Sequence, residues 1–179
     1  MVAAIEQDRR LVFTYGTLKR GFSNHVLMQE MIRDGDAAFL GISHTVEKFP
    51  LVCGPYRVPF LINLAGAGDC VLGELYSVSP RGVARMDELE GVSRGHYERL
   101  PISVRLISID DSDEEAPVFQ GEAYYAHRSY GEELWERNGK KGFCAYSESE
   151  AKGYVKRKDR PQGITFLDQI QIFIESTSE

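Results

Sequence analysis

The chain has 179 residues, of which 42% are hydrophobic and 27% are charged, and its formal net charge is −6. This length suits one domain with a sizeable core and is too short for two comfortable ones. The acidic balance argues against a protein that binds nucleic acid unaided, because phosphate binding needs clustered Lys and Arg. The basic segments, Lys19-Arg20 and residues 152–160, are expected to be solvated surface.

Targeting and redox features point to the cytoplasm. No apolar run approaches the length of a membrane span, so no membrane partner is expected. The first ten residues lack the basic and apolar regions of a secretory signal. Cys53, Cys70 and Cys144 are odd in number and widely spaced, which is typical of reduced thiols rather than of a disulfide framework. A cytoplasmic location is therefore expected, with a nuclear or organellar pool left open.

A buried strand followed by a glycine turn is predicted in the segment LVFTYGTLKRG, residues 11–21. The apolar run 11–15 does not alternate, which indicates a strand buried on both faces. Gly16 lets the backbone turn and approach a ligand closely. The amides around Thr17 are then free to bind an anion, as consecutive N–H groups after a strand often do. The segment is a candidate small-molecule site, although most strand-Gly-Thr turns are only turns.

The chain from there to residue 127 shows several strand patterns and two helix patterns. One helix is predicted after Ser23-Asn24, since apolar residues share one face as far as Ile32. Residues 50–64 are expected to be extended with a loop inside, and the acidic run 110–115 to be an exposed hairpin loop. Further strands are predicted at residues 38–46, 70–78, 100–106 and 118–127. Five or six strands with two short helices indicate the α+β class, as a small, mainly antiparallel β-barrel or curled sheet.

Residues 128–179 are more polar and form a C-terminal extension that we expect to pack on the domain. The apolar stretch 166–174 is ambiguous, because Phe166, Ile170 and Phe173 have helical spacing whereas Ile170, Ile172 and Ile174 have strand spacing. The predicted organisation is an N-terminal tail (1–10), a domain (11–127) and the extension (128–179).

The second helix, predicted over residues 79–90, carries a second site candidate. Ser79 and Pro80 suit its first positions and Gly91 suits the position after its end. Glu90 lies four residues after Met86, which places its carboxylate on the inward, apolar face. Lost hydration and the negative end of the helix dipole both raise the pKa of a carboxyl group there, so Glu90 is a candidate general base. The alternative is a structural Glu that points outward or accepts a hydrogen bond.

Other reactive residues are less persuasive. The four histidines have no metal-ligand spacing. Cys53 paired with His44 is a candidate nucleophile, but a small core thiol is the more common role. Tyr97 and Tyr125 suit the wall of a ligand site as well as they suit the core. Residues 66–70, GAGDC, lack the strand and helix context of a phosphate-binding turn.

Four segments together resemble the γ-glutamylcyclotransferase-like family. They are FTYGTLKRGFSNH (13–25), EKFPLVCGPYRVPFLINLAGAG (47–68), VLGELYSV (71–78) and MDELEGVSRGHYER (86–99). The resemblance is closest to the γ-glutamylamine cyclotransferase branch and to the avirulence-induced-gene-like proteins of plants. The segments keep the family's order and spacing and together cover roughly residues 11–127.

The resemblance implies a small β-barrel flanked by helices, with a cavity between the YGTL loop and a catalytic carboxylate. The family's catalytic Glu falls on Glu90, and its substrate loop falls on Tyr15, Gly16, Thr17 and Leu18. The tyrosine of the last strand is matched to Tyr125. The extension does not match the branch's shorter tail, and such an extension can line or cover the cavity mouth and so affect substrate size and specificity.

The activity implied is the release of 5-oxoproline and a free amine from γ-glutamylamines or related γ-glutamyl amides. The substrate's α-amine attacks its own γ-carbonyl, so the enzyme mainly holds the folded conformer and removes a proton through Glu90. Amides of residues 16–18 would hold a carboxylate or the oxyanion. No metal, nucleotide or other cofactor is expected, and the partner expected is the small γ-glutamyl substrate, with protein partners left open.

Two alternatives belong to other classes. The first is a non-catalytic small-molecule-binding or interaction domain that keeps the same cavity. The second is a hydrolase that depends on Cys53.

Overall fold

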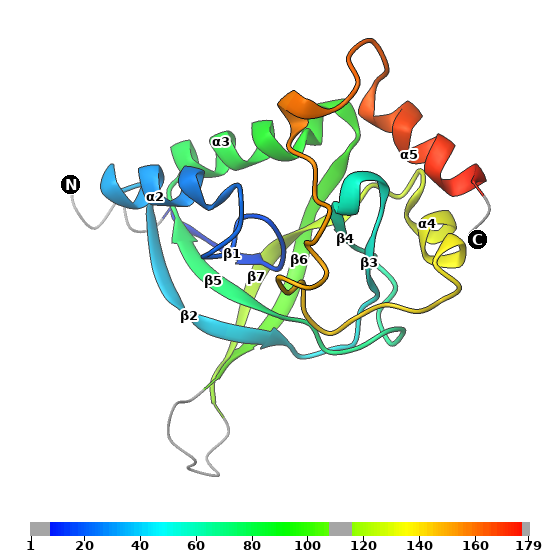
Figure 1. The fold of residues 1–179 in the computed structure, drawn as a ribbon. Coiled ribbons are helices and arrows are strands. Elements are labelled where there is room, and N and C mark those ends of the chain that lie inside the picture. Colours follow the sequence, from blue (N-terminus) through cyan, green and yellow to red (C-terminus); the bar gives the residue numbers. More distant parts are fainter. Residues whose placement is uncertain (1–7, 108–115, 177–179) are drawn as a thin grey trace.

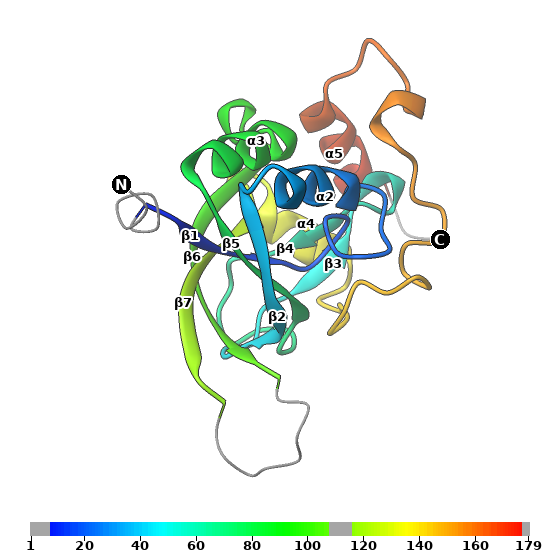
Figure 2. The ribbon, with the colours of Figure 1, turned by 90° about the vertical axis from the view of Figure 1, so that its left-hand side faces the viewer.

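The structure is a computed structural model that describes residues 8–107 and 116–176. Five strands close into a barrel in the order β1-β5-β2-β6-β7, and β7 pairs with β1 to complete the ring (Figures 1 and 2). The β1–β7 pair is parallel and the other pairs are antiparallel. The strands are β1 (Arg10–Thr14), β2 (Ala37–Thr45), β5 (Leu72–Val78), β6 (Tyr97–Leu106) and β7 (Val118–Ala126). The predicted α+β class and mainly antiparallel barrel are confirmed.

A short hairpin extends the sheet beside β7. Its strands are β3 (Leu51–Cys53) and β4 (Pro59–Leu61), with the 3-10 turn η1 (Pro55–Arg57) between them, and β4 pairs with β7 in parallel. The prediction of an extended segment with a loop inside therefore holds for residues 50–64. The loop splits this segment into two paired strands, so the sheet has seven strands where five or six were predicted.

The two predicted helices are present, and the extension adds one helix that the sequence analysis did not predict and one where helix and strand had both been left open. The helices are α2 (His25–Arg33), α3 (Pro80–Glu90), α4 (Gly131–Arg137) and α5 (Phe166–Glu175), with 3-10 turns η2 (Val92–Arg94) and η3 (Arg157–Asp159). α5 decides the ambiguity at residues 166–174 in favour of a helix. Thr165 caps it by accepting from the Asp168 N–H, and Ile170 is buried while Ile172 is 58% exposed.

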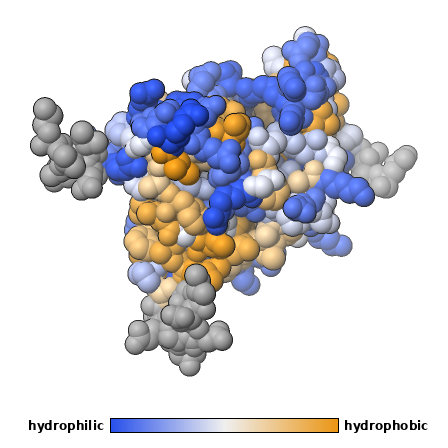
Figure 3. All heavy atoms as spheres, turned by 60° about the vertical axis from the view of Figure 1, so that its left-hand side comes forward, coloured by the Kyte–Doolittle hydropathy of each residue, from blue (hydrophilic) through white to orange (hydrophobic). Residues whose placement is uncertain are grey.

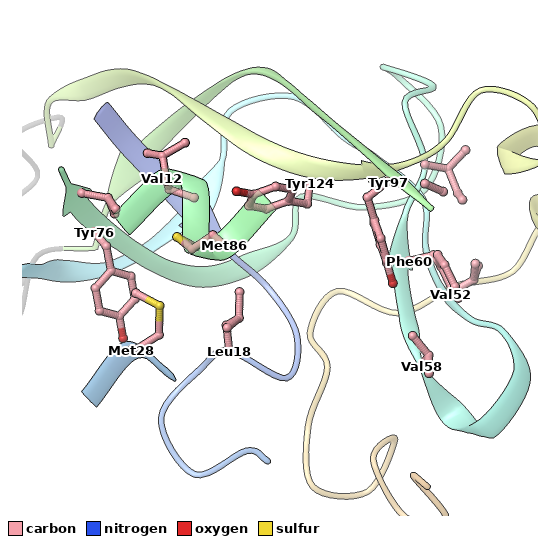
Figure 4. Close-up of a cluster of buried hydrophobic side chains, with 14 of the residues drawn as sticks. Val12, Leu18, Met28, Val52, Val58, Phe60, Tyr76, Met86, Tyr97 and Tyr124 are labelled. Atoms are coloured by element: carbon pink, nitrogen blue, oxygen red, sulfur yellow. The ribbon is translucent and has the colours of Figure 1, made fainter. Parts of the chain in front are cut away.

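Successive residues of the barrel strands point into two different apolar clusters. Val12, Tyr76 and Tyr124 pack with helix residues between the barrel and the helices (Figure 4), whereas their neighbours Phe13 and Tyr125 pack in a second cluster made of strands and loops. Because both faces of these strands are buried, an unbroken apolar run at residues 11–15 is what this position requires.

The extension packs along the barrel and returns to its helical side. Its backbone pairs with two strands, through Phe143 N–H to the Leu51 carbonyl at 3.0 Å and Leu72 N–H to the Cys144 carbonyl at 2.8 Å. Further along, the Phe166 ring stacks on Phe60 with centroids 6.1 Å apart. Figure 1 shows the segment between these contacts rising in orange to the end of α3. Residues 128–176 are therefore tied to the barrel at several points.

The outer face of β2 and its neighbours carries exposed apolar side chains, which gather above the grey loop in Figure 3. They include Phe39, Ile42, Leu72 and Ile107, all more than a third exposed. The predicted acidic hairpin loop, 110–115, lies outside the described residues. Within the described ranges, no helix is long and apolar enough to cross a membrane.

Candidate active site

A cavity of about 220 Å³ opens between the loop after β1 and the C-terminal end of α3. The loop contributes residues 15–18, and α3 contributes Leu89 and Glu90. The β3–β4 hairpin adds Val58 and Pro59, and the extension supplies the remaining wall. The structure thus brings together five of the six residues that the sequence singled out, namely Tyr15, Gly16, Thr17, Leu18 and Glu90.

Gly16 is needed at the start of the loop because the hairpin lies directly against it. A Cβ at this position would stand 2.6 Å from Cγ of Pro59. The backbone beyond it turns tightly, with Lys19 N–H bonded to the Gly16 carbonyl and Asn24 N–H to the Thr17 carbonyl. Within the described part of the chain, no acceptor meets the N–H groups of Gly16, Thr17 or Leu18. Three successive amides are therefore available to an anion.

Four tyrosines line the cavity, and the hydroxyls of three of them donate to other parts of the protein. Tyr15 donates to the Tyr124 carbonyl, Tyr97 donates to the Pro59 carbonyl at 3.0 Å, and Tyr124 donates to Asp87 at 2.7 Å. These rings therefore shape the cavity and exclude water, while their hydroxyls fix the strands around it. Tyr97, which suited either a wall or the core, serves as both.

Tyr125 does not reach the cavity, and its neighbour Tyr124 occupies the wall instead. Successive side chains of a strand point to opposite faces, so only one of the pair can face the site. Tyr125 packs in the second cluster and donates to the Pro101 carbonyl at 3.1 Å. The sequence analysis chose Tyr125, and alternation could not correct that choice because the C-terminal part of β7 is buried on both faces.

Glu90 is the last residue of α3 and faces the cavity. The helix starts at Ser79, whose hydroxyl accepts from the Gly82 N–H at 3.0 Å, and it stops at Gly91, which has the left-handed φ of 64°. Val83 and Met86 are buried on the same side, as the spacing predicted. Glu90 is half-buried as a residue, yet in the described structure its carboxyl meets no hydrogen-bond donor.

The surroundings of Glu90 raise its pKa to about 7. Burial is the main cause, because an ionised carboxylate loses hydration there. The positive charge of Arg157 acts in the opposite direction, and the negative charge of Asp87 adds to the rise. A carboxyl group with this pKa exchanges protons efficiently near neutral pH.

Asp87 joins the tyrosine wall to a chain of charges on the barrel surface. Arg99 bridges it through both carboxylate oxygens, at 2.9 and 3.2 Å, and also contacts Glu122 at 2.6 Å. A carboxylate with two charge-assisted bonds and a tyrosine donor holds its position firmly. Asp87, which lies one helical turn before Glu90 in α3, therefore holds the Tyr124 ring in position.

The extension brings a cationic rim that the sequence did not indicate. Four side chains around the cavity mouth are basic: Lys156, Arg157, Lys158 and Arg160. The segment 152–160 was expected to be solvated surface, and residues 156–158 are exposed, but they also line the mouth. No periodicity in the sequence indicates where a loop of this kind will lie. The other basic pair is engaged structurally, since Lys19 donates to the Tyr146 carbonyl and Arg20 pairs with Glu74.

Cys53 has none of the features of a nucleophile. It is buried, it is not part of the cavity lining, and burial raises the pKa of its thiol to about 11. Its proposed partner His44 bonds the Thr45 carbonyl through Nδ1 at 2.9 Å. Among the described residues, no group of three or more His, Cys, Asp or Glu side chains is placed to hold a metal.

An ionised Glu90 should lower the free energy of unfolding, and Glu90→Gln should remove this loss of stability. The folded-state pKa of about 7 lies above the unfolded value of about 4.3, so the folded protein holds the proton longer. Stability is therefore lost as the pH rises between these two values. We expect the variant to exceed wild type by about 1–3 kcal/mol at pH 8 and to match it near pH 4. Urea unfolding at both pH values measures this, and an equal difference at both would contradict it.

Comparisons with known proteins agree on one family. The family model described as gamma-glutamyl cyclotransferase, AIG2-like, matches residues 12–142, which extends past the predicted domain end at residue 127. A putative gamma-glutamylcyclotransferase of Arabidopsis thaliana is 62% identical over 172 residues, covering 93% of this chain and 92% of that one. The gamma-glutamylaminecyclotransferase of Rattus norvegicus is 42% identical over 97 residues, which span 54% of this chain and 64% of the rat protein.

The fold comparison leads to the same result. The crystal structure of an aig2-like protein from Mus musculus matches with a TM-score of 0.69 at 31% identity, covering 85% of this chain and 99% of the mouse chain. The barrel and its helices are shared with that structure. From the sequence, the barrel and the cavity together, the chain belongs to the γ-glutamyl cyclotransferase, AIG2-like family.

Proposed function

We propose that the protein converts γ-glutamylamines or related γ-glutamyl amides into 5-oxoproline and a free amine, with Glu90 as the proton acceptor. The observation that carries the proposal is a single carboxyl group of raised pKa facing a cavity whose loop offers three free amides. The family membership and the name of the rat relative support the substrate class. Three free cysteines, two of them exposed, support a reducing compartment such as the cytoplasm.

The reaction joins two groups of one molecule, so positioning supplies much of the rate. The α-nitrogen of the glutamyl group attacks the γ-carbonyl carbon and closes a five-membered ring. The cavity, with Tyr15, Tyr97 and Tyr124 in its wall, can hold the glutamyl group in this folded conformer. When the enzyme holds that conformer, the α-nitrogen and the γ-carbonyl carbon stay close together, whereas in free solution they meet only rarely.

The proton balance defines the task of Glu90. The α-nitrogen enters as an ammonium with three protons and leaves as a ring amide with one. Glu90 accepts a proton so that the lone pair is free to attack. Two protons in all pass to the departing nitrogen, which leaves as an ammonium when its bond to the γ-carbon breaks. A carboxyl with a pKa of about 7 can both accept and return them.

The loop amides stabilise the charge that the attack creates. Ring closure turns the γ-carbonyl oxygen into an oxyanion, and the substrate also carries an α-carboxylate. The N–H groups of Gly16, Thr17 and Leu18, which meet no acceptor within the described residues, belong to the cavity wall. Donors fixed in advance stabilise an oxyanion without having to reorganise during the reaction.

A non-catalytic binding domain with the same cavity is the second candidate. It would need the cavity and the loop, but it would not need a carboxyl group of raised pKa. Substrate analogues separate the two candidates and also exclude hydrolysis. A γ-glutamyl amide with a free α-amine should release 5-oxoproline, and the same compound acetylated on that amine should be inert, because its nitrogen cannot close the ring.

The assay is the separation of 5-oxoproline, glutamate and amine by liquid chromatography. γ-Glutamyl-ε-lysine, γ-glutamyl-alanine and glutathione form the substrate panel. Glutamate release, or turnover of the acetylated compound, would show that the reaction is hydrolysis and not cyclisation. Binding without any product across the panel would favour the binding-domain candidate.

A further inference from the structure

We propose that the cationic rim of Lys156, Arg157, Lys158 and Arg160 selects γ-glutamyl substrates whose leaving amine carries two negative charges, as an acidic amino acid does. The inference rests on the proposed function and specifies the substrate class for the same cavity. It concerns the extension, which supplies all four side chains.

The charge of the cavity lining is strongly unbalanced. Its four basic side chains face one carboxyl group, that of Glu90. Within the described residues, none of the four cations forms an ion pair, whereas six other arginines on the barrel and its helices pair with carboxylates at 3.2 Å or less. Unpaired cations gathered at one opening favour an anionic ligand, because they attract it and gain partners when it binds.

Arg160 is held in place before any ligand arrives. Its Nε donates to the Val155 carbonyl at 2.9 Å, and its guanidinium carbon lies 5.3 Å from the Tyr56 ring centre and 5.5 Å from that of Phe166. Its Nη2 also donates to the Tyr154 hydroxyl at 3.4 Å, and aromatic faces stabilise a guanidinium without using its remaining N–H groups. This half-buried arginine is therefore a preorganised donor at the wall and not a freely moving surface charge.

Arg157 lies near Glu90, where its charge opposes the rise of the Glu90 pKa. Its charge also helps to lower the pKa of His96 to about 4, after the larger effect of burial. Arg157 lines the same cavity as Glu90 and forms no ion pair within the described residues, so its guanidinium is available to a ligand. The glutamyl part cannot account for all four charges, because it carries a single carboxylate, whereas the rim carries four cations.

The second charged end of the substrate is therefore assigned to the leaving amine. The loop and Glu90 hold the glutamyl part, and the rim faces the part that departs. An acidic amino acid offers two carboxylates to the rim, whereas a simple alkylamine offers none. Opposite charges at a partly exposed site differ from a neutral contact by up to about fivefold in affinity.

Two isosteric substrates test the inference, γ-glutamyl-glutamate and γ-glutamyl-glutamine. They differ only in the charge of the leaving group's side chain, so the chemistry at the scissile bond is the same. We expect wild type to favour the glutamate compound by about fivefold in kcat/KM, mainly through KM. High salt should reduce this preference, since exposed charges are screened.

Lys156→Gln/Lys158→Gln should lower the preference for the glutamate compound, with a smaller loss for the glutamine compound, whose leaving group offers the rim one carboxylate in place of two. Both lysines are exposed, so the fold should tolerate the change. Lys152→Gln is the matched control, because Lys152 is an exposed lysine of the same extension that does not line the cavity. Arg160→Gln should lower the preference further, and Arg160→Lys should restore part of it.

The outcomes separate this inference from the proposed function. Release of 5-oxoproline from both substrates at equal rates by wild type would overturn the rim's role and leave the reaction in place. An equal loss for both substrates in the lysine variant would assign the rim to the glutamyl carboxylate instead. Absence of 5-oxoproline from both, with folded protein, would overturn the proposed function and the inference together.

Discussion

Glu90→Gln is expected to fold like wild type and to lose about 10³-fold in kcat/KM for 5-oxoproline release. The substitution keeps the size and shape of the side chain and removes only its ability to take a proton. The α-ammonium of the substrate then has no acceptor in the cavity, since no other residue that lines it carries a carboxyl group. The measurement is steady-state turnover with circular dichroism and unfolding curves recorded on the same preparations.

Glu88→Gln is the control on the same helix. Glu88 is exposed, pairs with Arg94 at 3.2 Å and does not line the cavity. Its variant should keep wild-type activity, because a surface ion pair of this kind contributes little. Near-normal turnover by Glu90→Gln would show that Glu90 is not the base. The proton acceptor would then have to be a group of the substrate itself.

The sequence predicted the barrel, helix α3 and the position of Glu90 because each depends on local pattern. Ser79, Pro80 and Gly91 fix the two ends of α3, and a spacing of four from the buried Met86 places Glu90 on the inner face. The strand and the turn before the loop were predicted for a similar reason, from a run that does not alternate and a glycine directly after it; the loop's place in a site came from the family resemblance.

The parts of the cavity that the sequence missed depend on contacts distant along the chain. Tyr124 and Tyr125 cannot be told apart by alternation, because β7 is buried on both faces. The rim is delivered by an extension whose course is set by tertiary contacts, including Phe166 on Phe60 and Val155 N–H to the Tyr56 carbonyl. A stretch without periodicity gives no indication of which surface it will cover.

Gly16→Ala is expected to lower kcat/KM about 100-fold while the protein stays folded. The added methyl carbon would stand 2.6 Å from Cγ of Pro59, closer than carbon atoms approach. Pro59 has little freedom to give way, since its carbonyl accepts from Tyr97 and its strand pairs with β3. The loop must therefore shift, and the amides of Thr17 and Leu18 move with it.

Gly131→Ala provides the comparison at a glycine with room for a side chain, where the nearest atom to an added Cβ is 3.6 Å away. It should keep full activity. The loss in Gly16→Ala should appear mainly in kcat, because amides aimed at the oxyanion act in the transition state. A loss confined to KM would instead mean that the loop holds the substrate's carboxylate, and unchanged kinetics would remove the loop from the reaction altogether.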